Sequence, residues 1–212
     1  LGPNDPTPPS GGRQTTEWCR WPLACMIDSG MRTRRRPPLF CDLDKTLIHA
    51  AEAVDEDCRE HELDPTRRRV FGYDVRLRPE AHEILRLCRE GGREVHLFTH
   101  ATFGFAVAVA KAFGLGFDER SVFSTAMIFN CRRGLCPRAA LIDDKPPRDP
   151  NTRAKIEALG IATEQVWIIP AFEPPRFASA RLFVAGLPYR LARLDHAPAP
   201  TGVEHRQGRT AH

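Results

Sequence analysis

The chain has 212 residues, 42% of them hydrophobic, which is enough to bury one good core but not two. Residues 38–194 carry 23 basic and 22 acidic side chains, so the net charge of +4 comes mostly from the N-terminal arm. This near balance argues against a dedicated nucleic-acid-binding surface. The seven cysteines are an odd number in a chain without a signal-peptide core or a membrane-length apolar span, which indicates a reducing cytoplasm and no membrane partner.

The two ends of the chain differ in composition from the middle. Residues 1–37 contain stretches rich in proline and glycine and hold six arginines against three acids, and residues 195–212 show no periodicity. Both segments are predicted to be disordered, which leaves 38–194 as the folded domain. Met31 is a candidate native start, with the segment before it extended or mispredicted translation; the alternative is a genuine disordered arm.

The first predicted strand ends in a pair of carboxylates. A short apolar run after two prolines leads into Asp42 and Asp44, and Thr46 follows. Such a run is typical of an interior strand, and we expect it to end at the first carboxylate. A bend there can aim the Asp42 side chain and the Asp44 backbone carbonyl at one cation, leaving the Asp44 side chain for proton transfer. This division of roles suits phosphoryl transfer to a carboxylate.

A surface segment, two helices and a second strand are expected between residues 52 and 110. Residues 52–69 are dense in acids, close on three arginines and are expected to form a surface excursion or flap. A helix over 81–88 follows from its apolar spacing and from the two glycines that stop it. Residues 95–98 are predicted as a strand that ends in Thr99, and 103–110 as a helix apolar nearly all round, which should be buried.

A second acidic motif follows another apolar run. Residues 139–142 are predicted as a strand ending in Asp143 and Asp144, and a helix over 151–159 and a strand over 165–169 come next. Strands that alternate with helices imply an α/β fold with a doubly wound parallel sheet and right-handed crossovers. Ligands gather at the carboxyl ends of the strands in such sheets, so the acids and the hydroxyl are expected to converge on one site.

These motifs resemble those of a known family. The run 42–50, the pair Arg78-Pro79 and the strand-plus-hydroxyl 95–99 resemble the NLI-interacting-factor or CTD-phosphatase-like branch of the haloacid dehalogenase superfamily. The resemblance covers about residues 38–145. It departs at Lys45, where the branch usually has a glutamate, and this lysine puts a positive charge beside the Asp42 loop.

The resemblance implies a phosphatase that uses Mg²⁺ as its cofactor. Asp42 would attack phosphorus to give an aspartyl-phosphate, which water then hydrolyses. Asp44 would protonate the leaving oxygen and later deprotonate the water, and Thr99 would hydrogen-bond a phosphoryl oxygen. Asp42, the Asp44 carbonyl and one or both of Asp143 and Asp144 would supply the hard oxygen ligands that magnesium needs.

One part of the family's site has no obvious counterpart. The family places a lysine or arginine between the hydroxyl motif and the final acids, and the only lysine there, Lys111, falls on the helix expected to be buried. Arg132 and Arg133 lie in that interval, and Lys145 lies just beyond the acids. Any of these three can supply the positive charge that binds the phosphate, because the role needs a fixed cation and not a particular chain position.

The spacing of the motifs leaves no room for a folded cap. The intervals from Asp42 to Thr99 and from Thr99 to Asp143 are 57 and 44 residues, and predicted strands and helices use most of each. An open site favours exposed phosphates, such as phosphoserine or phosphothreonine on a protein, and small phosphomonoesters also fit.

The sequence therefore predicts a magnesium-dependent phosphomonoester hydrolase whose partner is a phosphorylated protein or small molecule. Two alternatives stay open. The first is a catalytically impaired relative that binds a phosphorylated ligand or a metal, which the missing lysine and Lys45 favour. The second is a nucleic-acid-binding module built on the arginine-rich arm, which the near-neutral middle disfavours.

Overall fold

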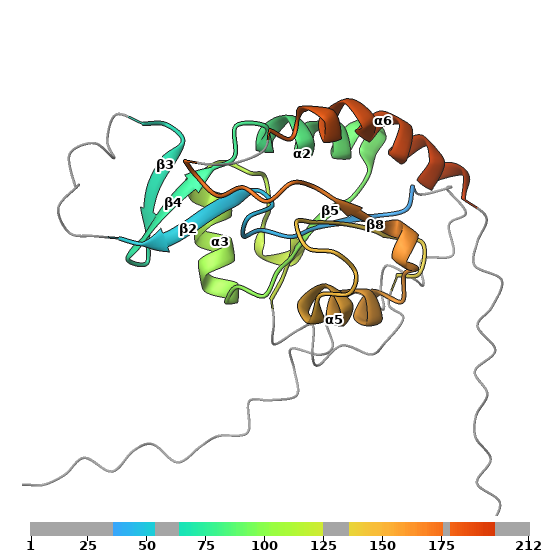
Figure 1. The fold of residues 1–212 in the computed structure, drawn as a ribbon, viewed down its shortest axis with the longest axis horizontal. Helices are drawn as coiled ribbons and strands as arrows, with labels where there is room; N and C mark the ends of the chain where they lie inside the picture. The colour runs from blue at the N-terminus through green and yellow to red at the C-terminus, as the bar shows by residue number, and fades with distance from the viewer. Residues whose placement is uncertain (1–35, 54–63, 125–135, 176–178, 198–212) are drawn as a thin grey trace, which may run out of the picture. The chain divides into compact units, whose positions relative to one another are not determined.

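The protein is described by a computed structural model that covers residues 36–53, 64–124, 136–175 and 179–197. The two ends that the sequence predicts to be disordered lie mostly outside the described residues, at 1–35 and 198–212. The centre of the fold is a five-stranded parallel sheet in the order β6-β5-β1-β7-β8 (Figure 1). Its strands are β1 (Leu39–Cys41), β5 (Val95–Phe98), β6 (Val122–Phe123), β7 (Ala140–Asp143) and β8 (Val166–Ile168). The predicted doubly wound parallel α/β sheet is confirmed.

Helices cover both faces of this sheet. In Figure 1, α2 and α6 run along one side of the sheet and α5 lies on the other. The α-helices are α2 (Ala81–Arg89), α3 (Phe103–Ala112), α5 (Pro150–Leu159) and α6 (Arg181–His196). Short 3-10 helices span Glu90–Gly92, Glu119–Ser121 and Thr163–Gln165. The three α-helices predicted from apolar spacing are present, each within three residues of its expected bounds.

Helix α5 matters for the site because it follows the second acidic motif. The Asp149 carboxylate accepts a hydrogen bond from the Asn151 backbone N–H at 2.9 Å and so caps the first turn. Pro150 stands at the first helical position, where its missing N–H costs nothing. Gly160 ends the helix in the left-handed conformation at φ 71°, which favours glycine. These local signals fix where the helix begins, and therefore which residues of its first two turns face the sheet.

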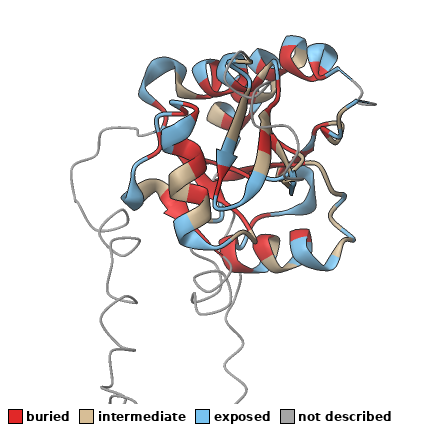
Figure 2. Cartoon of the chain, turned by 90° about the vertical axis from the view of Figure 1, so that its left-hand side faces the viewer, coloured by how far each residue is buried: buried red, intermediate tan, exposed pale blue. Residues whose placement is uncertain are grey.

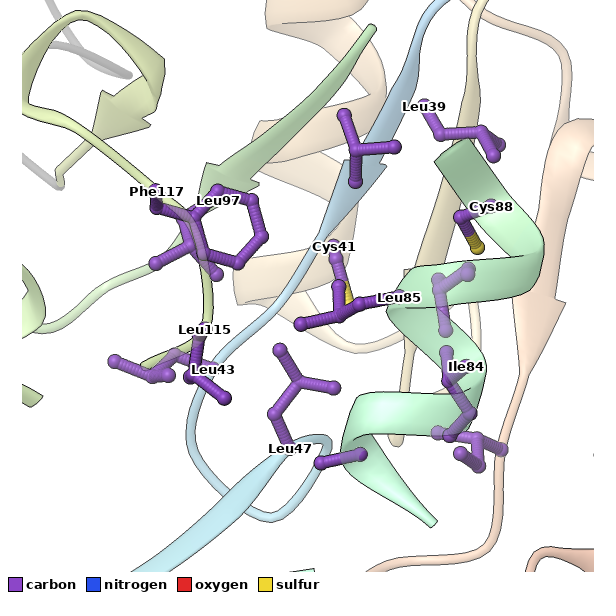
Figure 3. Close-up of a cluster of buried hydrophobic side chains, with 14 of the residues drawn as sticks. Leu39, Cys41, Leu43, Leu47, Ile84, Leu85, Cys88, Leu97, Leu115 and Phe117 are labelled. Carbon is purple, nitrogen blue, oxygen red and sulfur yellow. The ribbon is translucent and has the colours of Figure 1, made fainter. Parts of the chain in front are cut away.

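The apolar core packs the strands against the helices. Leu39 and Cys41 of β1 point to the face that Ile84, Leu85 and Cys88 of α2 cover (Figure 3). Side chains alternate along a strand, so Phe40, which lies between Leu39 and Cys41, points to the opposite face of the sheet. Figure 2 shows buried residues concentrated in the strands and on the inward sides of the helices. Burial on both faces is what a parallel sheet requires, and it makes the sheet a rigid platform for the residues at its edge.

A second, antiparallel sheet lies between the first strand and α2. It is formed by β2 (Ile48–Glu52), β4 (Tyr73–Leu77) and β3 (Arg67–Val70), in the order β2-β4-β3. The prediction of a surface flap over 52–69 was therefore incomplete: residues 54–63 lie outside the described residues, but the flanking residues pair as strands. These strands show little apolar alternation, and Arg67 pairs with Asp74 at 2.7 Å across them instead. The insert is small, in agreement with the prediction that no folded cap domain is present.

The prediction that the helix over 103–110 is buried was wrong. Only Ala106, Val109 and Ala110 of α3 are fully buried, and Phe103 is 36% exposed. The helix packs against β3 of the insert and β6 of the main sheet. Its apolar outer residues form part of the wall of a surface cavity, which explains why a helix with so few polar residues is not enclosed.

One buried histidine gives a prediction about stability. His96 of β5 stacks on Phe40 at 5.1 Å and meets Phe123 edge to face at 5.6 Å, and neither ring nitrogen has a hydrogen-bond partner within the described part of the chain. Burial lowers the pKa of His96, and the nearby Glu94 and Asp118 offset this only in part. Between about pH 7 and pH 5.5 the unfolded chain therefore binds a proton that the folded chain does not, and stability falls as the pH falls.

We expect His96→Phe to reduce this loss of stability. Urea unfolding at about pH 7.5 and at about pH 5.5 should show a smaller difference in unfolding free energy for the variant than for the wild type. His82→Gln, a change at an exposed histidine of α2, is the matched control and should leave the difference unchanged. Equal pH dependence in His96→Phe and the wild type would contradict the assignment.

Candidate active site

The Asp42 loop continues directly from the central strand. The Asp42 backbone N–H donates to the Ile142 carbonyl at 2.9 Å, so the chain stays paired with β7 for one residue past β1. The loop then turns: the N–H groups of Leu47 and Ile48 both donate to the Leu43 carbonyl, and Lys45 adopts a positive φ of 58°. This tight turn leaves the Asp42 carboxylate 7% exposed at the end of the strand.

A buried arginine donates hydrogen bonds to the backbone of the Asp42 loop. Arg78, which is 0% exposed, donates from Nε to the Thr46 carbonyl at 2.6 Å, and from one terminal nitrogen to the carbonyls of Lys45, at 3.0 Å, and Pro170. Its guanidinium lies 5.2 Å from the ring centre of Phe172, whose N–H also donates to the Lys45 carbonyl at 2.7 Å. Arg78 therefore joins the Asp42 loop to the segment that follows β8.

We expect Arg78→Met to cost about 3 kcal/mol of unfolding free energy. The change leaves the buried Thr46 carbonyl and the partly buried Pro170 carbonyl without the Arg78 donor, which is more costly than losing an exposed contact. Chemical denaturation measures the loss. The control is Arg86→Met on α2, which breaks only the exposed pair with Glu90 and should change the unfolding free energy by less than about 0.5 kcal/mol. Similar losses in both variants would contradict the role given to Arg78.

Three carboxylates meet where the strands end. Oxygen atoms of Asp42, Asp143 and Asp144 lie within 4.8 Å of one another. They come from the carboxyl ends of β1 and β7, which are neighbours in the sheet, as the sequence predicted. Burial, together with the negative charges of Asp42 and Asp143, raises the pKa of Asp144 to about 6. Burial also raises the pKa of Asp42. Burial and neighbouring negative charge therefore both disfavour the ionised form of Asp144.

One lysine lies between two of these carboxylates. Lys155 of α5 places its Nζ 2.7 Å from Asp42 Oδ1 and 2.8 Å from Asp143 Oδ2, and the residue is 2% exposed. Burial acts to lower the pKa of Lys155, but the two carboxylates outweigh it and the net pKa is raised, so the side chain is held as a cation. Lys155 is thus a fixed positive charge in direct contact with the Asp42 carboxylate.

The two adjacent acids have different partners. Asp143 is 1% exposed, and both of its oxygens accept hydrogen bonds, from Lys155 Nζ and from the Lys145 backbone N–H at 2.9 Å. Asp144 is half-buried, and among the described residues the Thr46 hydroxyl, at 3.4 Å, is the side-chain donor that contacts it. Within the described part of the chain, Asp144 is therefore the acid with oxygen atoms still available for a cation beside Asp42.

A cavity of about 600 Å³ opens over this cluster. Thr99, at the end of β5, lies in its wall, and the Thr99 Oγ1 accepts the Ala101 backbone N–H at 3.2 Å, which leaves the hydroxyl proton available. Lys45 stands at the rim and pairs with Glu173. Tyr73 of the insert and Phe105 of α3 also line the cavity, with ring centres 5.5 Å apart. The cavity thus combines an acidic floor with an aromatic wall.

The cavity brings most of the predicted site residues together. Its lining includes all four predicted acids, the predicted hydroxyl and one of the three candidate cations: Asp42, Asp44, Asp143, Asp144, Thr99 and Lys145. Arg132 and Arg133, the other two candidate cations, lie outside the described residues. No helix in the described ranges is long and apolar enough to cross a membrane.

Sequence reasoning missed Lys155, because the candidate cations that it considered ended at Lys145, just beyond the acids. A signal was available in the helix predicted over 151–159, where the buried stripe is Thr152, Lys155, Ala158 and Leu159. A lysine within the buried stripe of a helix needs a buried anion as its partner. The N-terminal turns of a helix that follows a strand also lie near the carboxyl end of that strand, where the acids are.

Residues 37–133, a little under half of the chain, match the model of the NLI interacting factor-like phosphatase family. The matched range includes the Asp42 loop, Arg78 and Thr99. It ends before Asp143, so the second half of the site rests on the geometry described above. A comparison with curated proteins found no match.

Two solved structures show a more distant similarity. One is the structure of Fcp1, an essential RNA polymerase II CTD phosphatase, with 19% identity and a TM-score of 0.49 over 82% of this chain and 53% of that chain. The other is a fission yeast Fcp1 variant bound to beryllium fluoride, with 20% identity and a TM-score of 0.45 over 82% of this chain and 54% of that chain. The chain covers about half the length of each.

Proposed function

We propose that residues 38–194 form a magnesium-dependent phosphomonoester hydrolase that works through an aspartyl-phosphate on Asp42. The observation that carries the proposal is the arrangement at the cavity floor, where the Asp42 carboxylate contacts Lys155 at 2.7 Å and lies beside Asp143 and Asp144. A buried carboxylate next to a fixed cation, at the base of an open cavity, suits attack on a phosphate.

The reaction uses the chain's own residues in two displacements. In the first, an Asp42 oxygen attacks phosphorus, the bond from phosphorus to the ester oxygen breaks, and Asp44 donates a proton to the leaving oxygen. In the second, Asp44 takes a proton from water, which attacks phosphorus and releases inorganic phosphate and Asp42. Lys155 offsets the negative charge of Asp42 and of the incoming phosphate throughout, and Thr99 donates to a phosphoryl oxygen.

The donor set fits magnesium. Asp42 and Asp144 offer carboxylate oxygens within 4.8 Å of one another, and the backbone carbonyl of Asp44 is the further hard oxygen ligand that we propose. Asp143 is the less suitable ligand, because its oxygens already accept from Lys155 and from the Lys145 N–H. When bound, the cation would offset the shared negative charge of the carboxylate and the phosphate.

Of the remaining candidate cations, Lys145 is the one that lies within the described residues. Lys145 lines the cavity and acts to lower the pKa of Asp144, so its charge is felt at the acids. We keep Lys145, Arg132 and Arg133 as proposed phosphate-binding residues, with Lys155 taking the inner position. The alternative of a catalytically impaired relative loses its main support, because the cation that seemed to be missing is supplied by α5.

The shape of the cavity supports a phosphorylated protein as substrate. Phe71, which is 71% exposed, and Tyr73 extend the cavity away from the acids, along the antiparallel insert. Such a surface can hold the residues that flank a phosphoserine or phosphothreonine, whereas a small phosphomonoester would leave it uncovered. Proteins bearing phosphoserine or phosphothreonine are therefore the proposed substrate class.

The test is hydrolysis of an aryl phosphate and of a panel of phosphoserine and phosphothreonine peptides, with Mg²⁺ and with a chelator. We expect phosphate release that needs Mg²⁺ and is faster with at least some peptides. The Asp42→Asn variant, purified in parallel, reports any contaminating phosphatase. Binding of phosphopeptides without any release of phosphate would instead establish the binding module. Release that is unaffected by the chelator would contradict the role of magnesium.

A further inference from the structure

Helix α5 carries a second polar residue on the same face as Lys155. Thr152 precedes Lys155 by three residues, so the two side chains are neighbours on the helix surface. Thr152 is 0% exposed and is one of the residues that line the cavity. Asp143 and Thr99, at 1%, and Lys155, at 2%, are almost equally buried and line the same cavity. Thr152 therefore belongs to the floor of the cavity.

The Thr152 hydroxyl has no hydrogen-bond partner in the part of the chain that the structure describes. A threonine in a helix usually donates to the carbonyl three or four residues before it, and this bond is not made here. A buried hydroxyl left without a partner is destabilising, and such groups in a folded protein call for an explanation. A ligand oxygen bound in the cavity would be a hydrogen-bond partner for the Thr152 hydroxyl and would explain why it has none within the described chain.

The loop after β5 brings Thr99, another hydroxyl-bearing residue of the cavity, close to the first turn of α5. His100 Nε2 lies 3.1 Å from the Asn151 carbonyl, so the segment that follows Thr99 is hydrogen-bonded to the first turn of α5. Thr99 and Thr152 are each one residue from this contact. The positive end of the helix dipole lies at the same first turn and favours an anion there.

We propose that Thr152 is a second phosphate-binding hydroxyl, which donates to an oxygen of the phosphoryl group held at Asp42. This inference rests on the proposed function. It assigns to α5 two of the groups that surround the phosphate, the Lys155 ammonium and the Thr152 hydroxyl, with Thr99 contributing from β5. Because these side chains are nearly closed to solvent, the phosphate enters by separating them slightly at the floor.

Two variants of Thr152 separate phosphate binding from packing. Thr152→Val keeps the shape and removes the hydroxyl, whereas Thr152→Ser keeps the hydroxyl and removes a methyl group. The probe is inorganic phosphate in the presence of Mg²⁺, measured by calorimetry and, where turnover is present, as a competitive inhibitor. We expect the dissociation constant for phosphate to rise about tenfold in Thr152→Val and to stay within about twofold of the wild type in Thr152→Ser. The melting temperature of Thr152→Val should not fall, because the change removes an unpaired buried hydroxyl.

The outcomes distinguish this inference from the proposed function. If the wild type hydrolyses phosphate esters and Thr152→Val binds phosphate as the wild type does, the role of Thr152 is overturned and the proposed function stands. If the wild type shows no turnover but phosphate binding weakens in Thr152→Val alone, the role of Thr152 is supported and the hydrolase is overturned. Equal weakening in the valine and serine variants would overturn the inference in favour of a packing role.

Discussion

Replacing Lys155 by methionine should lower kcat/KM for phosphate-ester hydrolysis about 1000-fold. Lys155 is the described cation that contacts both Asp42, at 2.7 Å, and Asp143, at 2.8 Å. Without it the Asp42 carboxylate faces two other acids, and an approaching phosphate adds further negative charge. Methionine fills a similar volume, so the packing beneath the cavity is kept. Steady-state kinetics at saturating Mg²⁺ measures the effect.

Two matched variants show whether activity depends on the charge of Lys155 or on its position in contact with Asp42. Lys155→Arg keeps the charge and should retain part of the activity, with a loss smaller than that of Lys155→Met. Lys145→Met removes a cation from the wall of the same cavity and should cost about tenfold or less, because its effect on the acids is not a direct contact. A Lys155→Met enzyme within about tenfold of the wild type would contradict the role assigned to α5.

Asp42→Asn should abolish turnover, with a loss of about 10,000-fold or more. Asparagine has nearly the same shape, but its amide is a poor nucleophile and cannot form the acyl-phosphate. The variant should fold normally, because losing one of three clustered carboxylates relieves charge repulsion. Circular dichroism and the melting temperature check the fold, and the same kinetic assay measures the activity.

Asp44→Asn is the informative companion to Asp42→Asn. Asp44 lies in the cavity but is exposed, so its loss should not disturb the cluster beneath. With an aryl phosphate, whose leaving group needs little protonation, the first displacement should persist while hydrolysis of the aspartyl-phosphate slows. Equal losses in both variants at every step would contradict the separate roles of nucleophile and proton carrier.

The parts of the site that could be predicted are those set by local sequence. Asp42, Thr99 and Asp143 each end a short apolar run, and short buried runs that alternate with helices indicate a parallel sheet. In such a sheet the ends of β5, β1 and β7 lie side by side, so convergence of these residues follows from topology alone. The same reasoning could not say which of Asp143 and Asp144 is free for a cation, because that depends on donors from Lys145 and Lys155.

The parts that could not be predicted depend on tertiary contacts. Helix α6 was missed because Gly186 and Pro188 interrupt its helical signal, although Phe183, Leu187, Leu191 and Leu194 form a buried stripe along it. Strand β6 is two residues long, which is too short for any pattern. The antiparallel insert is held by its ladder and by the pair between Arg67 and Asp74, neither of which shows in apolar periodicity.

Trapping the phosphorylated enzyme tests the central claim most directly. The Asp44→Asn variant is mixed with an aryl phosphate and Mg²⁺, quenched in acid after a short delay and digested, and the peptide that contains Asp42 is analysed by mass spectrometry. The account predicts that this peptide gains the mass of one phosphoryl group, that the modification maps to Asp42, and that a chelator prevents it. Turnover by the wild type without a phosphoryl group on Asp42 in either protein would contradict the account.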